Sequence, residues 1–421
     1  MYLFYSLLYT IALIFILPFQ YLKRPKDIRK RWLREKFGLF NSQFSILNSE
    51  FIWVHAVSVG EVMAAIPLLK KLKHRYPSKG IVLSTITDTG QKVAQEGAPE
   101  GTAIIYLPFD ISLILKTVLK MTRPEILIII ETELWPNMFR VFKANGVPII
   151  LLNGRISEKS YKGYKKISLF MKKVLSNVDF FGMQERIYAE RILSFGIDSS
   201  RVRYLGNLKF DTQPPTQIPK WTEKIRGPVI VAGSTHEGEE ELIISVYIKL
   251  KEDFSDLNLI IAPRHPERFN EVEEMLKSLE IKFIKRSSLS VHTSRPDEIQ
   301  GELILLDSIG ELSVIYGIST IAIIGKSFRG YGGQNPLEPA YWGKPILCGP
   351  HMENFPVIGD FYKEGAAVEV SEDRLYSKLK EMLLSPEKAK EVGLKAQQLY
   401  RRNTGAVDRS LEIVSQYIPE K

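Results

Sequence analysis

The sequence has a single cysteine, Cys348, in 421 residues. One cysteine excludes an intramolecular disulfide and a cysteine-based zinc cluster, and it is typical of a reducing compartment. The six histidines have no spacing that suits a metal site. The sequence also lacks a P-loop, a nucleophile elbow, an H-E-x-x-H pair and a G-x-G-x-x-G segment after the first expected strand. It therefore carries none of the common signatures of nucleotide hydrolysis, serine hydrolysis or zinc proteolysis.

The first 22 residues, MYLFYSLLYTIALIFILPFQYL, carry no charge. They are long enough to cross the hydrocarbon core of a bilayer, and a cleaved signal peptide fits poorly because the charged start and the small-residue cleavage site are missing. The basic residues that follow are Lys23, Arg24, Lys26, Arg29, Lys30, Arg31, Arg34 and Lys36. By the positive-inside rule, this run predicts a membrane anchor with the rest of the chain in the cytoplasm. A buried helix of a soluble core remains the alternative.

The net charge of +9 could reflect nucleic acid, anionic lipid or phosphorylated substrates as partners. Binding to nucleic acid would need basic residues interleaved with exposed aromatic residues. The clearest basic cluster instead follows the apolar segment directly, which favours the membrane and argues against nucleic acid.

From residue 51 onward, short β-branched runs alternate with amphipathic stretches, as in parallel-sheet βα units. The length suggests two domains of roughly 200 residues each, and the proline-rich stretch at 209–219 suits a linker. We expect an anchor at 1–22, a basic juxtamembrane segment at 23–50, doubly wound α/β domains at 51–211 and 222–371, a linker at 212–221, and C-terminal helices at 372–421. Two such domains would face each other across a cleft at the carboxyl ends of their strands.

In the first half, three charged residues follow expected strands: Glu61, Glu131 and Arg155. Glu61 lies in the first turn of an expected helix, where it could complement the helix dipole or act as a general base. Glu131 follows a wholly apolar strand, where an unpaired carboxylate is costly. A metal site formed by Glu131 and Glu133 is disfavoured because no further ligand is evident nearby. Arg155 could simply neutralise one of these acids.

In the second half, Arg264 and His265 end an expected strand, which suits a phosphate or a nucleobase edge. The loop from Arg329 to Gln334 is rich in glycine, so its amides could approach a phosphate closely. After that loop, Asn335 could cap a helix that begins at Pro336, and Glu338 in the first turn could accept ribose hydroxyls. Ordinary turn chemistry explains each of these features singly.

Six segments carry a resemblance to a known family. They are HAVSVGE (55–61), ETELWPN (131–137), NGRIS (153–157), GNLKFD (206–211), PRHPERF (263–269) and GGQNPLEP (332–339). Together they resemble the 3-deoxy-D-manno-octulosonic acid (Kdo) transferases of Gram-negative lipid A assembly. One departure is visible, since Gly154 and Ile156 stand where relatives often have alanine and leucine. Arg155 itself is retained.

This resemblance implies the GT-B architecture, in which the N-terminal domain binds the acceptor and the C-terminal domain binds the nucleotide sugar. It implies an inverting glycosyltransferase with CMP-Kdo as donor, a lipid A precursor (lipid IVA) as acceptor, and no metal or other cofactor. By matching positions, Glu61 resembles the catalytic base, and Glu131 and Lys209 resemble residues that stabilise the transition state. The donor contacts correspond to Arg264, His265, Ile309, Gly310, Glu311, Asn335, Pro336, Leu337 and Glu338, and Arg155 is a further substrate-binding candidate.

Two alternatives remain open at this point. The first is another GT-B transferase on the cytoplasmic face that uses a UDP-sugar and a lipid-linked acceptor. The second is a two-lobed binding module that senses a nucleotide without catalysis, which would leave Glu61 and Glu131 without a purpose.

Overall fold

The chain, described by a computed structural model at residues 1–40, 50–211, 217–289, 298–330 and 332–418, divides into two compact units. Unit 1 comprises Met1–Thr212 and Asn403–Lys421, and unit 2 comprises Gln213–Arg402. Several expected features lie partly outside the described residues: 41–49 of the juxtamembrane segment, 212–216 of the linker, 290–297 of the second domain, 331 of the glycine-rich loop, and 419–421 at the end of the chain.

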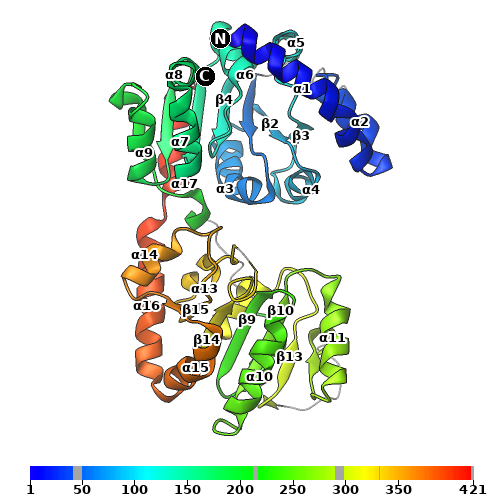
Figure 1. Cartoon of the computed structure of the whole chain (residues 1–421), viewed down its shortest axis with the longest axis vertical. Coiled ribbons are helices and arrows are strands. Elements are labelled where there is room, and N and C mark those ends of the chain that lie inside the picture. The colour runs from blue at the N-terminus through cyan, green and yellow to red at the C-terminus, as the bar shows by residue number, and fades with distance from the viewer. Residues whose placement is uncertain (41–49, 212–216, 290–297, 331, 419–421) are drawn as a thin grey trace. The chain divides into compact units, whose positions relative to one another are not determined.

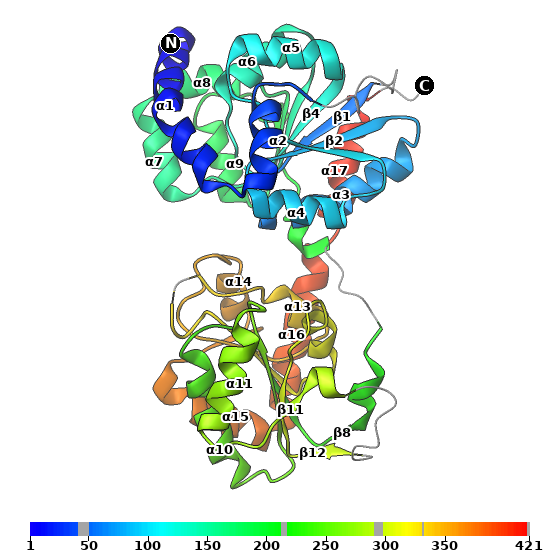
Figure 2. The same cartoon turned by 90° about the vertical axis from the view of Figure 1, so that its right-hand side faces the viewer.

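Unit 1 contains a seven-stranded sheet in the order β3-β2-β1-β4-β5-β6-β7 (Figures 1 and 2). Its strands are β1 (Phe51–His55), β2 (Gly80–Thr85), β3 (Thr102–Tyr106), β4 (Pro124–Ile130), β5 (Ile149–Gly154), β6 (Phe180–Met183) and β7 (Val202–Tyr204). All of these pairings are parallel. Strands β1, β2 and β5 are buried along their whole length, because a parallel sheet is covered by helices on both faces.

Helices cover both faces of this sheet. One hydrophobic cluster joins it to α5 (Ser112–Thr122), α6 (Pro136–Ala144), α8 (Ser168–Leu175) and α9 (Arg186–Leu193). The other joins it to α3 (Val59–Arg75), α4 (Asp88–Gly97) and the C-terminal helix α17 (Ala406–Ser415). Helix α7 (Glu158–Lys166) precedes α8 and has no buried residue. The last helix of the chain therefore completes the core of unit 1, and Asp211 holds it there by accepting hydrogen bonds from the amides of Gly405 and Val407, each at 2.6 Å.

Unit 2 contains a second parallel seven-stranded sheet, in the order β11-β13-β10-β9-β14-β15-β16. Its strands are β9 (Val229–Thr235), β10 (Asn258–Pro263), β11 (Ile284–Lys285), β13 (Leu303–Leu305), β14 (Ile321–Ile324), β15 (Ile346–Cys348) and β16 (Val368–Glu369). Two short strands, β8 (Ile225–Arg226) and β12 (Ile299–Gln300), pair separately.

The helices of unit 2 are α10 (Glu239–Lys251), α11 (Arg268–Ser278), α12 (Leu312–Ile315), α13 (Leu337–Tyr341), α14 (Ile358–Lys363), α15 (Leu375–Leu384) and most of α16 (Pro386–Asn403). One cluster joins α10, α11 and α15 to the sheet, and a second forms around Trp221, Ile315 and Tyr316. The expectation of two doubly wound α/β domains is confirmed. Strands β8, β12 and β16 are only two residues long, and strands this short carry no periodic pattern in the sequence.

The apolar N-terminal segment forms helix α1 (Tyr2–Lys23), which is long and apolar enough to cross a membrane. No residue of α1, all of which the structure describes, is buried, so α1 is not a core helix. One face of α1 nevertheless contacts unit 1. The Tyr5 hydroxyl donates to the Asp110 carboxylate at 2.8 Å, and the Ser6 hydroxyl bonds the Asn137 side chain. The next helix, α2 (Lys26–Lys36), packs through Trp32 against Tyr106 and Phe109.

Asp110 links α1 to α6. Besides Tyr5, its carboxylate accepts hydrogen bonds from the amides of Asn137 at 3.0 Å and Met138 at 2.7 Å. Asp110 is only 1% exposed, and an amide side chain cannot accept all three bonds, because its nitrogen would face a donor. We therefore expect Asp110→Asn to lower the free energy of unfolding by about 2–3 kcal/mol and to speed amide hydrogen exchange in α1 and α6.

The matched control is Glu100→Gln, which makes the same chemical change at an exposed position of unit 1 and should change stability by less than about 0.5 kcal/mol. Hydrogen exchange followed by mass spectrometry compares the two variants helix by helix. Equal exchange in α1 and α6 for both variants would contradict the linking role of Asp110.

Candidate functional site

Glu61 lies in the first turn of α3, beside the carboxyl end of β1. Its carboxylate accepts hydrogen bonds from the Val57 amide at 2.7 Å and from the Ser58 hydroxyl at 3.1 Å. The Ser58 hydroxyl in turn accepts from the Glu61 amide at 3.5 Å, so the two residues cap α3 reciprocally. The helix-end role considered from the sequence is therefore present. It does not exclude a second role.

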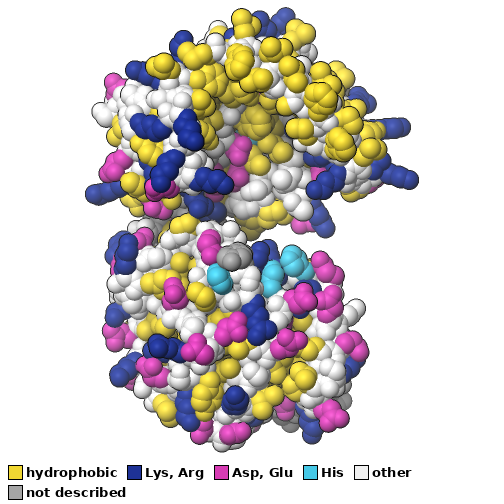
Figure 3. Space-filling model, viewed as in Figure 1, with side chains coloured by type: hydrophobic (Ala, Val, Ile, Leu, Met, Phe, Trp, Pro, Cys, Tyr) yellow, Lys and Arg dark blue, Asp and Glu magenta, His cyan; other side chains and the backbone are white. Residues whose placement is uncertain are grey.

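The environment of the Glu61 carboxylate favours its protonated form. The pKa of Glu61 is raised to about 7, mainly by burial and also by the negative charges of Glu131 and Glu133, while the hydrogen bonds from the Val57 amide and the Ser58 hydroxyl oppose the shift. A carboxyl with a pKa near 7 exchanges a proton readily at neutral pH, as a general base requires. Figure 3 shows acidic side chains inside a hollow on this face of unit 1.

Glu131 follows β4 in a left-handed conformation, with φ of 61°. For a residue other than glycine such backbone costs about 1–3 kcal/mol and often marks a functional site. The Glu131 carboxylate pairs with the Lys209 ammonium at 3.2 Å. The structure thus brings Glu131 and Lys209 into contact, although 77 residues separate them in the sequence.

Lys209 belongs to a short 3-10 helix, η3 (Leu208–Asp211), that Asn153 positions. The side-chain Oδ1 of Asn153 accepts a hydrogen bond from the Leu208 amide at 2.9 Å, and the Asn153 backbone is itself left-handed, with φ of 58°. Sequence reasoning did not single out Asn153. Its position could have indicated it. Asn153 lies at the end of β5, the strand next to β4, where a buried side chain can bond a segment from far along the chain.

Arg155 lies near these residues, but it does not neutralise the acids as the alternative supposed. Its backbone amide donates to the Thr132 hydroxyl at 2.8 Å, and its side chain interacts with Tyr188. In the described part of the chain, no ion pair joins Arg155 to Glu131 or Glu133. The guanidinium is therefore not committed to a carboxylate of the site.

Glu133 received little weight from the sequence, but it lies within electrostatic reach of Glu61. Its own pKa is raised by burial and by Glu131. His55, at the end of β1, is a second residue that sequence reasoning missed. Its Nδ1 bonds the Ser84 carbonyl and hydroxyl, and its buried Nε2 has no hydrogen-bond partner among the described residues.

In unit 2, the predicted donor residues follow three strands, β13, β10 and β14, and β9 lies between β10 and β14 in the sheet. Arg264 and His265 follow β10 and are exposed. The His265 ring packs edge-on against His236, with 5.6 Å between centroids, and Figure 3 shows histidine side chains exposed at one end of unit 2. Arg264 is close enough to Glu338 to influence that carboxyl electrostatically.

Ile309, Gly310 and Glu311 follow β13. Ile309 is 78% exposed, and Gly310 has a positive φ of 88° that favours glycine. Both oxygens of Glu311 accept hydrogen bonds from the Arg286 guanidinium at 2.7 Å, and this pairing contributes to a lowered pKa of Glu311. The Glu311 side chain is thus engaged by the protein, whereas Ile309 and Gly310 present open surface.

Residues 335–338 form the start of α13. The Asn335 side chain accepts from the Leu337 amide at 3.1 Å and donates to Glu338 at 3.3 Å. Because α13 begins at Leu337, its N-cap residue is Pro336 and not Asn335 as expected, and Asn335 bonds the Leu337 amide from the position before the cap. Burial raises the pKa of Glu338.

Glu239 holds the loop that leads toward Asn335, and it was missed from the sequence. Its fully buried carboxylate accepts hydrogen bonds from the amides of Lys326, Ser327 and Phe328 at 2.6–2.9 Å, and from the His236 amide at 3.0 Å. A run of backbone amides that points at one carboxylate forms an anion nest. Glu239 thus fixes the ends of β9 and β14 relative to each other.

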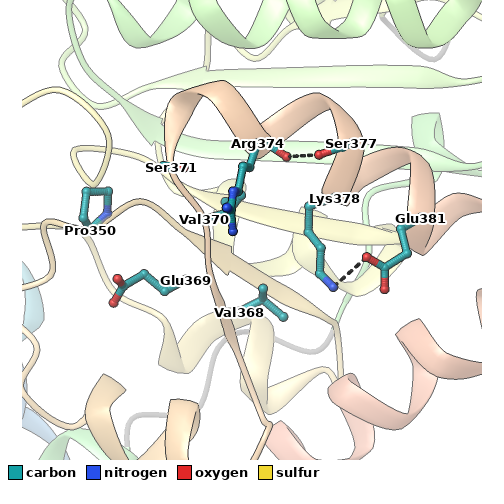
Figure 4. A pocket seen from close by; sticks show the side chains of 9 residues that line it. All are labelled: Pro350, Val368, Glu369, Val370, Ser371, Arg374, Ser377, Lys378 and Glu381. Atoms are coloured by element: carbon teal, nitrogen blue, oxygen red, sulfur yellow. Dashed lines mark hydrogen bonds and ion pairs between the residues drawn. The ribbon is translucent and has the colours of Figure 1, made fainter.

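A separate pocket of unit 2 lies between the end of β16 and α15 (Figure 4). It is lined by Pro350, Val368, Glu369, Val370, Ser371, Arg374, Ser377, Lys378 and Glu381. Lys378 is paired with Glu381 at 2.8 Å. None of the residues predicted from the sequence lines this pocket.

Solved structures share the fold of the whole chain. A UDP complex of MnaA from S. aureus superimposes with a TM-score of 0.57 at 15% identity, covering 88% of this chain and 98% of that chain. A glycosyltransferase from Rickettsia africae gives a TM-score of 0.56 at 16% identity, covering 89% and 100%. At these identities the likeness shows the fold alone. That fold is the GT-B architecture of glycosyltransferases, as expected from the resemblance.

Sequence comparison identifies the family. The family model described as 3-deoxy-D-manno-octulosonic-acid transferase (kdotransferase) matches residues 31–212. A 3-deoxy-D-manno-octulosonic acid transferase of Haemophilus influenzae is 33% identical over 99% of this chain and 98% of its own length. One of Aquifex aeolicus is 33% identical over 79% and 86%. The chain belongs to the 3-deoxy-D-manno-octulosonic acid transferase family, and it is therefore a glycosyltransferase.

The raised pKa of Glu61 gives a direct test of the site. Because Glu133 is one of its causes, Glu133→Gln should lower the pKa of Glu61, yet leave it above the ordinary value, since burial is the larger cause. Carboxyl titration followed by infrared difference spectroscopy, with Glu61→Gln to assign the band, measures this shift. Glu190→Gln, an exposed change on α9, should leave the band unchanged. An identical Glu61 band in the Glu133→Gln protein would show that Glu133 does not act on it.

Proposed function

We propose that the chain is an inverting, metal-independent transferase that moves Kdo from CMP-Kdo to a lipid A precursor, lipid IVA. The reaction would take place on the cytoplasmic face of the inner membrane. The observation that carries this proposal is a buried carboxyl with a pKa near 7, Glu61, beside the Glu131–Lys209 pair, in a chain of the Kdo transferase family.

In this proposal Glu61 removes the proton from the acceptor hydroxyl as that oxygen attacks the anomeric carbon of Kdo. The bond to the CMP phosphate breaks on the opposite face, which inverts the configuration. The hydrogen bonds from Val57 and Ser58 hold the carboxylate in one orientation. At neutral pH, the ionised carboxylate of Glu61 is the base. Because its pKa is high, Glu61 is a stronger base than an exposed carboxylate.

Glu131 and Lys209 form a preorganised charge pair next to the base. Such a pair can stabilise the charge that develops at the sugar and at the leaving phosphate. Strained backbone at Glu131 and Asn153 holds the two segments in place before substrate binds. Arg155, whose guanidinium is not paired with an acid of the site, would contact an anionic substrate group.

The donor would bind unit 2 through the loops after β13, β10 and β14. Exposed Arg264 and His265 supply a cation and ring nitrogens for the CMP moiety. Glu239 bonds backbone amides just before the glycine-rich segment. That segment leads to Asn335 and Glu338, which therefore lie at the same sheet edge. Leu337 and Pro336 shape the turn between them.

The membrane part of the proposal depends on α1. Ten of its apolar side chains are exposed, namely Leu3, Phe4, Leu7, Leu8, Ile11, Ile14, Phe15, Ile16, Phe19 and Leu22. The opposite face contacts unit 1 through Tyr5 and Ser6. A helix of this kind can enter the lipid while it keeps unit 1 at the headgroups, where the acceptor lies and where anionic lipid would meet the basic residues.

The first prediction separates the base from the helix cap. Glu61→Ala should lower the turnover number for Kdo transfer by about 10²–10⁴ while CMP binding, measured by calorimetry, persists. Ser58→Ala removes the cap hydroxyl but keeps the carboxylate, so its loss should be much smaller. Similar losses in the two variants would mean that Glu61 serves only as a cap.

The pH dependence follows from the same pKa. A base acts in its ionised form, so kcat/KM should fall as the pH drops through about 7. The fall should approach tenfold per pH unit below the pKa. Initial rates from pH 5 to 8 check this, and a flat profile between pH 6 and 8 would contradict the assignment.

The donor is tested by competition. Purified protein with a lipid A precursor should form product with CMP-Kdo and none with UDP-sugars, and product masses identify the sugar transferred. A product from a UDP-sugar alone would favour the other cytoplasmic transferase considered above.

A further inference from the structure

Lys36, the last residue of α2, has a buried ammonium without a partner. The residue is 6% exposed, and its Nζ lies 5.5 Å from the centroid of the Phe109 ring. Among the residues that the structure describes, no hydrogen bond or ion pair holds this ammonium. An unpaired buried charge is among the costliest features a protein can keep, so a partner is to be expected.

The neighbouring charges are already matched. Arg24 pairs with Asp88 at 3.2 Å, and Arg31 pairs with Glu35 at 2.7 Å. The second Glu35 oxygen accepts from the Tyr106 amide at 2.7 Å. Glu35, the acid that acts electrostatically on Lys36, is therefore bonded to Arg31 and Tyr106, and Asp88 is bonded to Arg24, so neither acid forms an ion pair with Lys36.

The electrostatics of Lys36 agree with a site that awaits an anion. The pKa of Lys36 is lowered to about 7, mainly by burial and also by the positive charge of Arg24, while the negative charge of Glu35 opposes the shift. The ammonium thus exchanges its proton near neutral pH. An anion at this point would restore the charged form, because opposite charges favour ionisation of both groups.

Lys36 lies at the sheet edge that also carries the candidate base. Its Nζ packs over the ring of Phe109, which follows β3, and its backbone carbonyl accepts a hydrogen bond from the Phe109 amide at 2.9 Å. Burial lowers the pKa of His55 at the end of β1, and the positive charge of Lys36 also lowers it. β1 leads directly to Ser58 and Glu61, and the buried His55 Nε2 lacks a hydrogen-bond partner in the described part of the chain. Two polar groups without a partner therefore lie at the sheet edge where ligands of parallel sheets bind.

We propose that Lys36 binds a phosphate monoester of the sugar headgroup of the lipid acceptor. This rests on the proposed function, and it names the group by which unit 1 recognises that acceptor. The 13 residues from Arg24 to Lys36 follow directly on α1. The N-terminal part of the chain therefore offers apolar side chains to the acyl chains and, a short distance later, a buried cation to the headgroup. A phosphate monoester fits because it carries up to two negative charges and accepts several hydrogen bonds.

Initial rates of the full chain in neutral-detergent micelles test the proposal, with two acceptors that differ only in the headgroup phosphate. Lys36→Met removes the charge at similar volume. We expect it to raise the KM for the phosphorylated acceptor at least tenfold, with the KM for CMP-Kdo within twofold of wild type. With the dephosphorylated acceptor, wild type and variant should differ by less than twofold. Lys36→Arg should recover most of the loss.

The matched control is Lys116→Met, which removes an exposed lysine of α5 in the same unit, outside the basic run, and should leave both acceptors unaffected. Equal losses on both acceptors would assign Lys36 a structural role and overturn the proposal. A change confined to the KM for CMP-Kdo would assign it to the donor and overturn it as well.

Binding of the two lipids without donor separates this proposal from the proposed function. Wild type could form no Kdo product but bind the phosphorylated lipid more tightly, with Lys36→Met abolishing that preference. This result would support the Lys36 site and contradict the proposed function. If wild type transfers Kdo and Lys36→Met still binds the phosphorylated lipid more tightly, the proposed function is supported and the Lys36 site is contradicted.

Discussion

Parallel pairing of buried strands is the constraint on which both units depend. Strands covered on both faces, such as β1 and β5, consist almost entirely of apolar side chains, so charged groups are excluded from the sheet interior. Parallel strands also end at one edge. The polar residues that follow them are thereby collected along a single line, and this is why Glu61, Glu131 and Arg155 lie near one another in unit 1.

Bringing several acidic residues together at one sheet edge costs free energy. The negative charge of Glu131 raises the pKa of both Glu61 and Glu133, and the charge of Glu133 also raises that of Glu61, in addition to the larger effect of burial on each. Lys209 offsets one of these charges, and it can do so only because Asn153 and Asp211 tie the segment around it to β5 and α17. The C-terminal helix is thus part of what supports the acidic site, although it comes from the far end of the chain.

Unit 2 also gathers polar groups at one sheet edge, but there backbone amides converge on a carboxylate of the protein. The amides at the end of β14 point toward a single position, and the protein fills that position with its own carboxylate, Glu239. Because Glu239 occupies this nest, the proposed donor contacts lie farther along the loop, at Asn335 and Glu338. Arg264 and His265 are exposed at the same edge, and among the described residues no acid forms an ion pair with either of them.

The basic run after α1 shows how far sequence reasoning reaches. Read in sequence, all eight cations look like a collar for anionic lipid. In the fold, Arg24 and Arg31 are engaged by Asp88 and Glu35, and Lys36 is buried. Side-chain direction on a short helix depends on what the helix packs against, here Tyr106 and Phe109, and nothing in the local pattern of α2 reveals it.

The sequence by itself determined the two doubly wound sheets, the apolar N-terminal helix and the family, because apolar runs of strand length and long motifs are local properties of the chain. Tertiary structure decided which of the polar residues act together. The pairing of Glu131 with Lys209, the support from Asn153 and the isolation of the Lys36 charge all depend on contacts between segments far apart in the chain. Burial and electrostatic coupling are properties of those contacts, so no local pattern encodes them.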